Sequence, residues 1–138
     1  MTGIVETAKE FFEACETGGG WEKCQQYCHL NASFAAQASA LEGINDLQGY
    51  TEWMKGLLTP VPDGRAQVRS LALDESRSKV VIVGVFHGTH TGDGGPVAPT
   101  GQKVAADYVY DITFDDGKIR RLTKIWNDVA TMQQLGWV

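Results

Sequence analysis

Two strand-like stretches near the C-terminus are joined by a turn of only three residues. Residues 104–114 are rich in β-branched and aromatic side chains and contain neither Gly nor Pro. Residues 115–117, Asp-Asp-Gly, are the types that a tight turn prefers, because Gly accepts positive φ without steric cost. Residues 118–126 form the second stretch. We therefore predict an antiparallel hairpin around which the rest of the chain folds.

Helical spacing dominates before residue 60, and strand-like sequence follows it. The first helix would begin at Thr2, a favourable N-cap, and end at Gly18. The remaining predictions are helices over 21–28, 43–58 and 129–135, strands over 31–41, 66–73 and 79–90, and a Gly- and Pro-rich loop over 91–101. Helices segregated from antiparallel strands predict one α+β domain over residues 1–138, with the helices on one face of a curled sheet.

The composition excludes several classes of partner. The net charge of −5 argues against nucleic acid, which requires clustered Lys and Arg. One local basic cluster, Lys118, Arg120, Arg121 and Lys124, alternates between strand faces, and we interpret it as a solvated or interface edge. We expect no membrane span and no signal peptide, because no apolar run approaches about 20 residues and no basic segment precedes an apolar one.

The three cysteines favour a reducing compartment. An odd number suits the cytoplasm better than a disulfide framework. Cys24, Cys28 and His29 are a possible metal set, but structural zinc usually needs a second close pair of ligands. We expect no metal and interpret the cysteines as buried apolar residues.

Aromatic side chains predict the walls of an apolar pocket for a small hydrophobic molecule. Alternation along strands places Tyr108 and Tyr110 on one face, and Lys124, Trp126 and Asp128 on one face of the next strand. A bent sheet covered by short helices leaves space in its middle, where such molecules usually bind. The residues that we expect to bind substrate are Trp53, Tyr50, Phe86, Tyr108, Tyr110 and Trp126.

Five motifs, in order, resemble the SnoaL-like polyketide cyclase family. They are residues 86–92 (Phe-His-Gly-Thr-His-Thr-Gly), 99–101 (Pro-Thr-Gly), 116–119 (Asp-Gly-Lys-Ile), 126–128 (Trp-Asn-Asp) and 134–136 (Gln-Leu-Gly). The resemblance implies the cone-shaped α+β barrel of nuclear transport factor two, with a curved mixed or antiparallel sheet and helices on its concave face. It also implies a homodimer formed through the outer face of the sheet, and chemistry without metal or cofactor.

In this family an Asp near the end of the last strand is the general acid/base of an intramolecular aldol ring closure. Asp128 is the matching position, although a one-residue shift would place Asn127 there. The alternative for Asp128 is an N-cap of the last helix. His90 also matches a family motif, and either contributes to the site or fixes its loop. We expect Tyr110, His90 or Asn127 to donate a hydrogen bond to the enolate.

The fold hosts unrelated activities, so three functions stay open. The first is a cyclase or isomerase that uses Asp128 on a hydrophobic carbonyl compound. The second is an epoxide-hydrolase type of enzyme, in which Arg121 with Asp107 or Asp111 activates water, provided that these side chains converge on the pocket. The third is a dimeric module that binds a ligand or assembles with a partner without catalysis.

Overall fold

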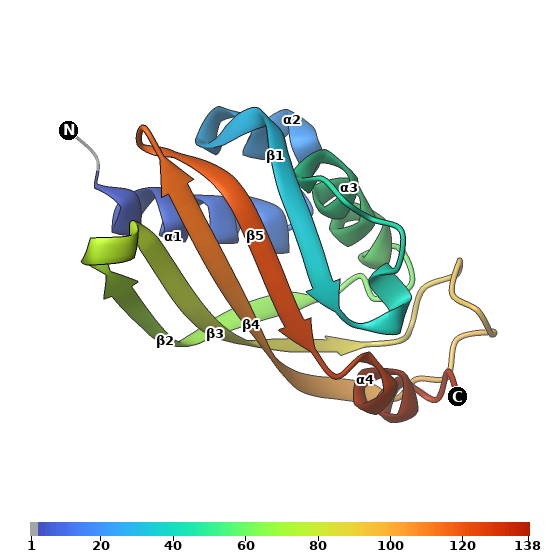
Figure 1. Cartoon of the computed structure of the whole chain (residues 1–138). Coiled ribbons are helices and arrows are strands. Elements are labelled where there is room, and N and C mark those ends of the chain that lie inside the picture. Colours follow the sequence, from blue (N-terminus) through green and yellow to red (C-terminus); the bar gives the residue numbers. More distant parts are fainter. Residues whose placement is uncertain (1–2) are drawn as a thin grey trace.

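The structure, a computed structural model, describes residues 3–138, so the N-cap predicted at Thr2 lies outside the described residues. Residues 3–138 form four α-helices and five strands (Figure 1). Their bounds are α1 Ile4–Glu16, α2 Gly20–Cys24, β1 Cys28–Gln37, α3 Leu47–Leu57, β2 Arg65–Asp74, β3 Lys79–Thr89, β4 Lys103–Asp115, β5 Lys118–Trp126 and α4 Asp128–Leu135. Short 3-10 turns occupy Gln25–Tyr27, Ser39–Leu41 and Glu75–Arg77.

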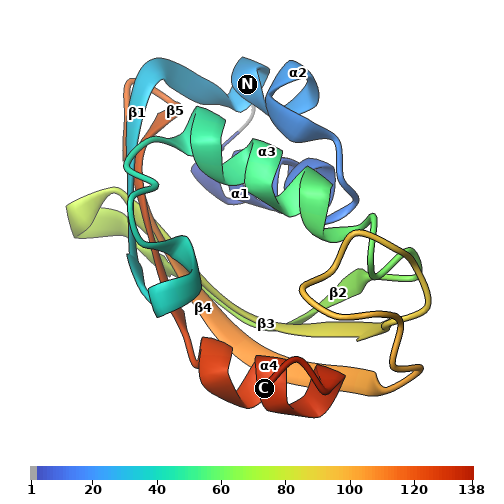
Figure 2. The ribbon, with the colours of Figure 1, turned by 90° about the vertical axis from the view of Figure 1, so that its right-hand side faces the viewer.

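The strands form one mixed sheet in the order β1-β5-β4-β3-β2. The pair of β1 with β5 is parallel, and the other pairs are antiparallel. Irregular register, at which a strand bends, occurs in β2, in β1 and in the pair of β4 with β5. The sheet curves around α1 and α3 (Figure 2), which confirms the predicted α+β fold with helices on the concave face.

Several boundaries differ from the predictions by a few residues. The helix predicted over 21–28 ends at Cys24, and β1 covers 28–37 instead of 31–41. The helix predicted over 43–58 begins only at Leu47, because the side chain of Asp46 accepts a hydrogen bond from the Gly49 N–H and caps it. The hairpin and the strands that precede it occur where the sequence predicts them.

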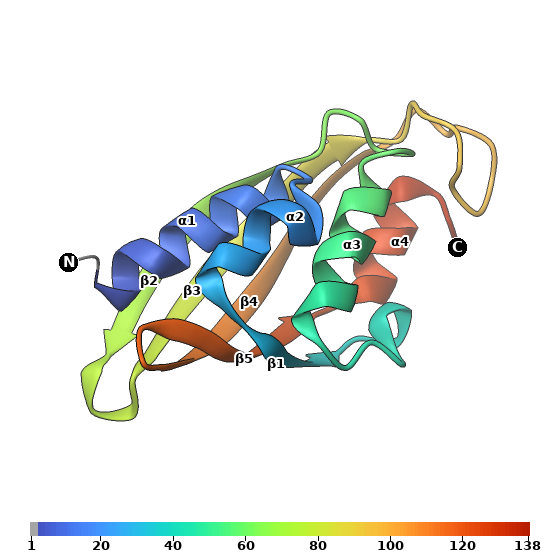
Figure 3. The ribbon, with the colours of Figure 1, turned by 90° about the horizontal axis from the view of Figure 1, so that it is seen from above.

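The helices cover the concave face in two groups. Seen from above, α1 lies over β2 and β3, and α3 overlaps α4 in projection (Figure 3). Figure 2 shows that α3 and α4 lie apart from each other, at the end of the sheet where β3 ends and β4 begins. The buried side chains of α1, α3 and the concave sheet face form one hydrophobic core. Among residues 3–138, no helix is long and apolar enough to cross a membrane.

Side chains alternate along the hairpin as predicted, with one interruption. Tyr108 and Tyr110 of β4 are buried on the concave face, as are Leu122, Lys124 and Trp126 of β5. Burial of Lys124 corrects the interpretation of the basic cluster as an edge, which holds only for the exposed members Lys118, Arg120 and Arg121. The bulge between β4 and β5 exposes two successive arginines and returns Lys124 to the concave side.

Candidate functional site

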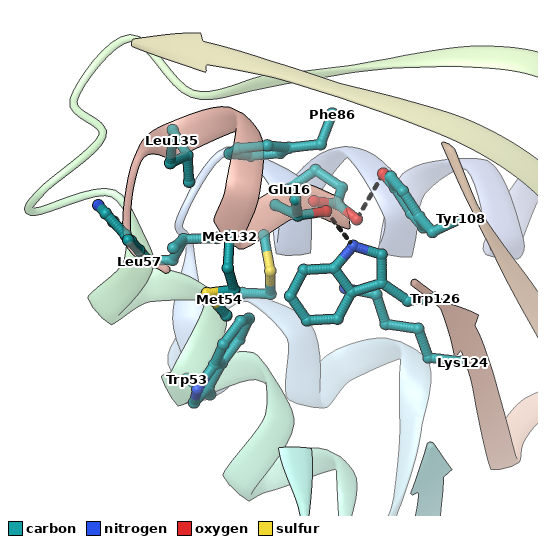
Figure 4. Close-up of a pocket in the computed structure, with 12 residues that line it drawn as sticks. Glu16, Trp53, Met54, Leu57, Phe86, Tyr108, Lys124, Trp126, Met132 and Leu135 are labelled. Atoms are coloured by element: carbon teal, nitrogen blue, oxygen red, sulfur yellow. Dashed lines mark hydrogen bonds between the residues drawn. The ribbon is translucent and has the colours of Figure 1, made fainter. Parts of the chain in front are cut away.

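A cavity lies between the concave face of the sheet, α3 and α4 (Figure 4). Its free volume is only about 20 Å³. This is room for roughly one water molecule, so a larger guest requires side chains to move. The lining is almost entirely apolar and consists of Glu16, Trp53, Met54, Leu57, Phe86, Tyr108, Lys124, Trp126, Thr131, Met132, Leu135 and Trp137.

Glu16 is the acidic group of this cavity. It is the last residue of α1, and it is only 2% exposed. Its Oε1 accepts hydrogen bonds from the hydroxyls of Tyr108 at 2.8 Å and Tyr110 at 2.6 Å. Its Oε2 is buried and has no hydrogen-bond partner among residues 3–138. One carboxylate oxygen is therefore held in place, and the other is free to accept a proton.

Lys124 joins the same network from β5. Its Nζ donates to the Tyr50 hydroxyl at 2.9 Å, and the hydroxyls of Tyr50 and Tyr110 are 2.5 Å apart. Because Tyr110 uses its only hydroxyl proton toward Glu16, Tyr50 must donate to Tyr110. The hydrogen bonds consequently run in one direction, from the Lys124 ammonium through two tyrosines to the Glu16 carboxylate.

Burial shifts the pKa values of both charged groups. Desolvation raises the pKa of Glu16, and the positive charge of Lys124 and the hydrogen bonds from Tyr110 and Tyr108 only partly oppose it. Desolvation lowers the pKa of Lys124 from 10.5 to about 8, and the negative charge of Glu16 only partly opposes this shift. Burial also raises the pKa of Tyr50 and Tyr110, so both hydroxyls keep their protons. Perturbed groups that share a cavity are typical of functional sites.

Sequence reasoning missed both charged residues, although each leaves a signal. Glu16 follows Phe12 by four residues and adjoins Cys15, so it falls on the apolar face of α1. Lys124 lies between Leu122 and Trp126 on the buried side of β5. A charged residue at an apolar position of an amphipathic element is the signal that identifies both.

The predicted substrate-binding residues all lie in or beside the cavity. Trp53, Phe86, Tyr108 and Trp126 line it. Tyr50 and Tyr110 are completely buried and belong to the hydrogen-bond network. The structure therefore brings the six predicted aromatic residues together.

The predicted catalytic pair Asp128 and Asn127 has a different environment. Asp128 does not line the cavity; its Oδ2 accepts from the Ala40 N–H at 2.7 Å and its Oδ1 from the Val129 N–H at 3.1 Å. Asn127, and not Asp128, is the N-cap of α4, because its side chain accepts from the Ala130 N–H. These contacts fasten the start of α4 to the turn after β1.

His90 is buried beside the C-terminus and is not among the residues that line the cavity. Its Nδ1 accepts from the Trp137 indole N–H at 2.9 Å, which places the ring proton of the neutral imidazole on Nε2. Trp137 lines the cavity, and together with Trp53 and Leu57 it also lines an open groove at the surface. His90 therefore positions a side chain that separates the cavity from the outside.

The residues considered for epoxide opening do not converge on the cavity: none of them lines it, and Arg121 is exposed. Asp107 pairs with Arg69 and Asp111 with Lys79. Both alternate with the buried Tyr108 and Tyr110 and so lie on the outer face of the sheet. Cys24 and Cys28 are free and buried. Within the described part of the chain, no group of three or more His, Cys, Asp or Glu side chains is arranged to hold a metal ion.

Comparison with known proteins identifies relatives of this fold. A family model described as SnoaL-like polyketide cyclase matches residues 6–135. No curated protein matches the chain. IdmH from Streptomyces antibioticus, assigned provisionally as a polyketide cyclase, superposes with a TM-score of 0.81 at 22% identity, over 96% of this chain and 98% of its own.

Two further solved structures are similar. AclR from Streptomyces galilaeus, assigned provisionally as a hydroxylase, has a TM-score of 0.79 at 21% identity, covering 98% of this chain and 82% of its own. A provisionally assigned polyketide cyclase from Acidithiobacillus ferrooxidans has a TM-score of 0.78 at 22% identity, covering 96% and 94%. At these identities the likeness establishes the shared fold, and the reaction must be argued from the site.

Proposed function

Because the chain belongs to the SnoaL-like polyketide cyclase family, we propose that it binds a small, mostly apolar carbonyl compound and transfers a proton on it, with Glu16 as the acid/base. The observation that supports this proposal most directly is that the buried Glu16 carboxylate lines an aromatic cavity with an Oε2 that has no hydrogen-bond partner among residues 3–138. The reaction class is cyclisation or isomerisation through an enolate. Such a step uses only side chains of the chain itself.

Burial suits Glu16 to this chemistry. A carboxylate whose pKa is raised by desolvation is a stronger base, and a larger fraction of it is protonated at a given pH, so the same group can take up a proton and later donate it. The two tyrosine hydroxyls fix the carboxylate, so that Oε2 keeps its orientation while a ligand binds. The positive charge of Lys124, in the same cavity, stabilises the negative charge that develops on the substrate oxygen.

The apolar lining supports a hydrophobic ligand, and its composition allows the cavity to expand. Met54 and Met132 face it from α3 and α4. Methionine has three rotatable bonds and adapts to irregular shapes at low cost. We propose that these two side chains move apart to admit a ligand larger than the cavity volume of about 20 Å³.

A non-catalytic ligand-binding module is the second candidate. The small free volume favours it, because a cavity that opens only for a guest also suits sequestration. The two candidates differ in Glu16: binding alone needs no carboxylate with a free oxygen. The raised pKa and the free Oε2 therefore favour catalysis.

We further propose a homodimer through the outer face of the sheet. Val83, Val109 and Ile125 are register partners across β3, β4 and β5, and Ile125 is 50% exposed. An apolar row of this kind is stabilised by a partner surface. Sedimentation at micromolar concentration is expected to give the mass of two chains, and the mass of one chain would contradict the dimer.

The three free thiols fit a cytoplasmic setting.

Exchange of carbon-bound protons tests the proposed reaction without knowledge of the natural substrate. We expect the protein in D₂O to accelerate deuterium incorporation at the α carbons of 2-tetralone, an apolar ketone. Glu16→Gln should lower this rate by about 100-fold, the usual contribution of a general base. Asp128→Asn is the matched control and should retain the wild-type rate, because Asn still accepts a hydrogen bond from Ala40.

The opposite pattern would move the reaction to Asp128. If Asp128→Asn lost exchange while Glu16→Gln kept it, Glu16 would be a structural residue. If the wild type bound 2-tetralone without accelerating exchange, the ligand-binding candidate would replace the enzyme.

A further inference from the structure

We propose that Lys124 forms a covalent imine with the carbonyl carbon of the ligand, so that the proton transfer by Glu16 acts on an iminium ion. This inference rests on the proposed function and names its ligand class as an aldehyde or ketone. It assigns to Lys124 a role beyond charge stabilisation. The observations that carry it are the position of Nζ, its surroundings and its connection to Glu16.

The position of Lys124 is that of a nucleophile. Its side chain lines the cavity, and the residue is only 4% exposed. Its one hydrogen bond among the described residues is to the Tyr50 hydroxyl at 2.9 Å, and no carboxylate lies within salt-bridge distance. A lysine held for structure alone would normally be paired in such a place. An amine desolvated in an apolar pocket is instead the recurrent nucleophile toward carbonyl groups.

The surroundings of Nζ suit both the neutral amine and the cationic iminium that forms from it. Five aromatic rings have centroids between 4.5 and 5.9 Å from Nζ, those of Tyr50, Trp53, Tyr108, Tyr110 and Trp126. Burial among them favours the neutral amine that attacks the carbonyl. Their π faces stabilise a cation, and an iminium at the same nitrogen stays inside this cage.

The network supplies the proton movements. The Lys124 ammonium first releases one proton into the tyrosine network, and the neutral Nζ attacks the carbonyl carbon. A proton then passes from nitrogen to the carbonyl oxygen, and the released proton returns to the resulting hydroxyl, which leaves as water and gives the iminium. Glu16 Oε2 then removes a proton from the α carbon, and the electron pair of the C–H bond forms a neutral enamine. Tyr50 and Tyr110 connect Nζ with Glu16 through hydrogen bonds of 2.9, 2.5 and 2.6 Å, so protons can move between the two groups.

The enamine leads to ring closure with all atoms balanced. Its α carbon attacks a second carbonyl carbon of the same molecule, and the new alkoxide takes the proton held by Glu16. Water then adds to the iminium, which restores the first carbonyl and leaves the positive charge on the regenerated Lys124 ammonium. One water is released and one consumed, so the net reaction is an intramolecular aldol addition.

Reductive trapping tests the imine directly. The intact protein is incubated with benzaldehyde and sodium cyanoborohydride at pH 7, which converts an imine into a stable benzyl amine, and the labelled residue is found by peptide mass mapping. At this pH an amine with a pKa near 8 is neutral roughly 300 times more often than an ordinary lysine. We expect at least about tenfold more label at Lys124 than at any other lysine.

Two variants control for surface labelling. Lys124→Arg keeps the positive charge and a donor toward Tyr50 but cannot form an imine, so the dominant label should disappear. Lys79→Arg replaces a half-buried lysine that pairs with Asp111 outside the cavity, and it should be labelled at Lys124 like the wild type. Glu16→Gln should also keep the label, because imine formation does not require the α proton to leave.

The outcomes separate this inference from the proposed function. If the wild type accelerates 2-tetralone exchange through Glu16 but shows no preferred label at Lys124, the imine is overturned and the acid/base role stands. If Lys124 is labelled but Glu16→Gln leaves exchange unchanged, the amine is confirmed and the role of Glu16 is overturned. Loss of both results overturns both proposals.

Discussion

Glu16 and Lys124 carry opposite charges, and burial moves their pKa values toward each other. Neither charge is held by a direct ion pair, because only tyrosine hydroxyls connect the two groups. Desolvating charged groups costs free energy that such bonds only partly offset. We infer that Glu16 and Lys124 are buried despite this free-energy cost because the function requires them in the cavity, as is common for buried charged groups.

The shifted pKa of Lys124 predicts how stability depends on pH. The unfolded chain keeps the lysine proton up to 10.5, whereas the folded protein loses it near 8. Between these values the unfolded state binds more protons, so folding stability rises with pH by up to about 1.4 kcal/mol per pH unit from this group. We expect the free energy of unfolding of the wild type, relative to that of Lys124→Met, to increase between pH 7 and 10.

Urea unfolding at several pH values measures this difference. Lys79→Met is the control, because Lys79 is partly exposed on the outer face, and its profile should run parallel to that of the wild type. Parallel profiles for Lys124→Met and the wild type would mean that Lys124 titrates as an ordinary lysine.

At the residue scale, the sequence predicts apolar partners better than charged ones. Alternation in strands places Tyr108, Tyr110 and Trp126 correctly, because burial of aromatic residues follows from hydrophobicity. Glu16 and Lys124 are exceptions, because charged residues are normally predicted to be exposed to solvent. Only their positions on apolar faces indicate the opposite.

At the element scale, β3 positions the network through a residue without a side chain. A Cβ at Gly84 would lie 2.8 Å from Tyr108 Cζ, 2.9 Å from its hydroxyl oxygen and 3.2 Å from Phe12 Cζ. Because Gly84 has no side chain, the Tyr108 ring fits beside it, and the Tyr108 hydroxyl donates a hydrogen bond to Glu16 at the end of α1. The close packing of β3, β4 and α1 depends on this position.

Gly84→Ala is therefore expected to destabilise the fold and disturb the network. Overpacking of this kind costs about 1–3 kcal/mol, and it displaces the Tyr108 hydroxyl from Glu16. Gly56→Ala is the matched control, since Gly56 is exposed in α3 with no heavy atom within 4 Å of an added Cβ. That change should stabilise the protein by about 0.5–1 kcal/mol.

Denaturant unfolding and the exchange rate of 2-tetralone together check this pair. Equal stability of the two glycine variants would show that Tyr108 can move without cost. A destabilised Gly84→Ala protein with an unchanged exchange rate would show that Tyr108 does not orient Glu16.

Elements with strong local signals were predictable, and elements that depend on distant partners were less so. The hairpin of β4 and β5 follows from its turn residues and side-chain pattern. The parallel pairing of β1 with β5 joins segments about 90 residues apart, and nothing local in 28–37 specifies it. The start of α3 was predicted too early, at Gly43, because Asp46 caps the helix and α3 begins at Leu47.

At the scale of the whole molecule, the cavity is closed by elements from both ends of the chain. Glu16 comes from α1, Trp53 from α3, Lys124 from β5 and Met132 from α4. The resemblance to the SnoaL-like family predicts the overall fold, which the family match from residue 6 to 135 confirms. It does not predict which polar groups this chain places inside, because those groups depend on tertiary packing.

The central claim is that ligands bind in the cavity between α3 and α4 and not near Asp128. Methyl NMR of the protein labelled with ¹³C at methionine tests it most directly, with assignment by Met54→Leu and Met132→Leu. Both side chains line the cavity, whereas Asp128 belongs to a separate surface depression beside Ser39. Addition of 2-tetralone is predicted to shift both methyl signals. Saturable binding of 2-tetralone that leaves both signals in place would contradict the account.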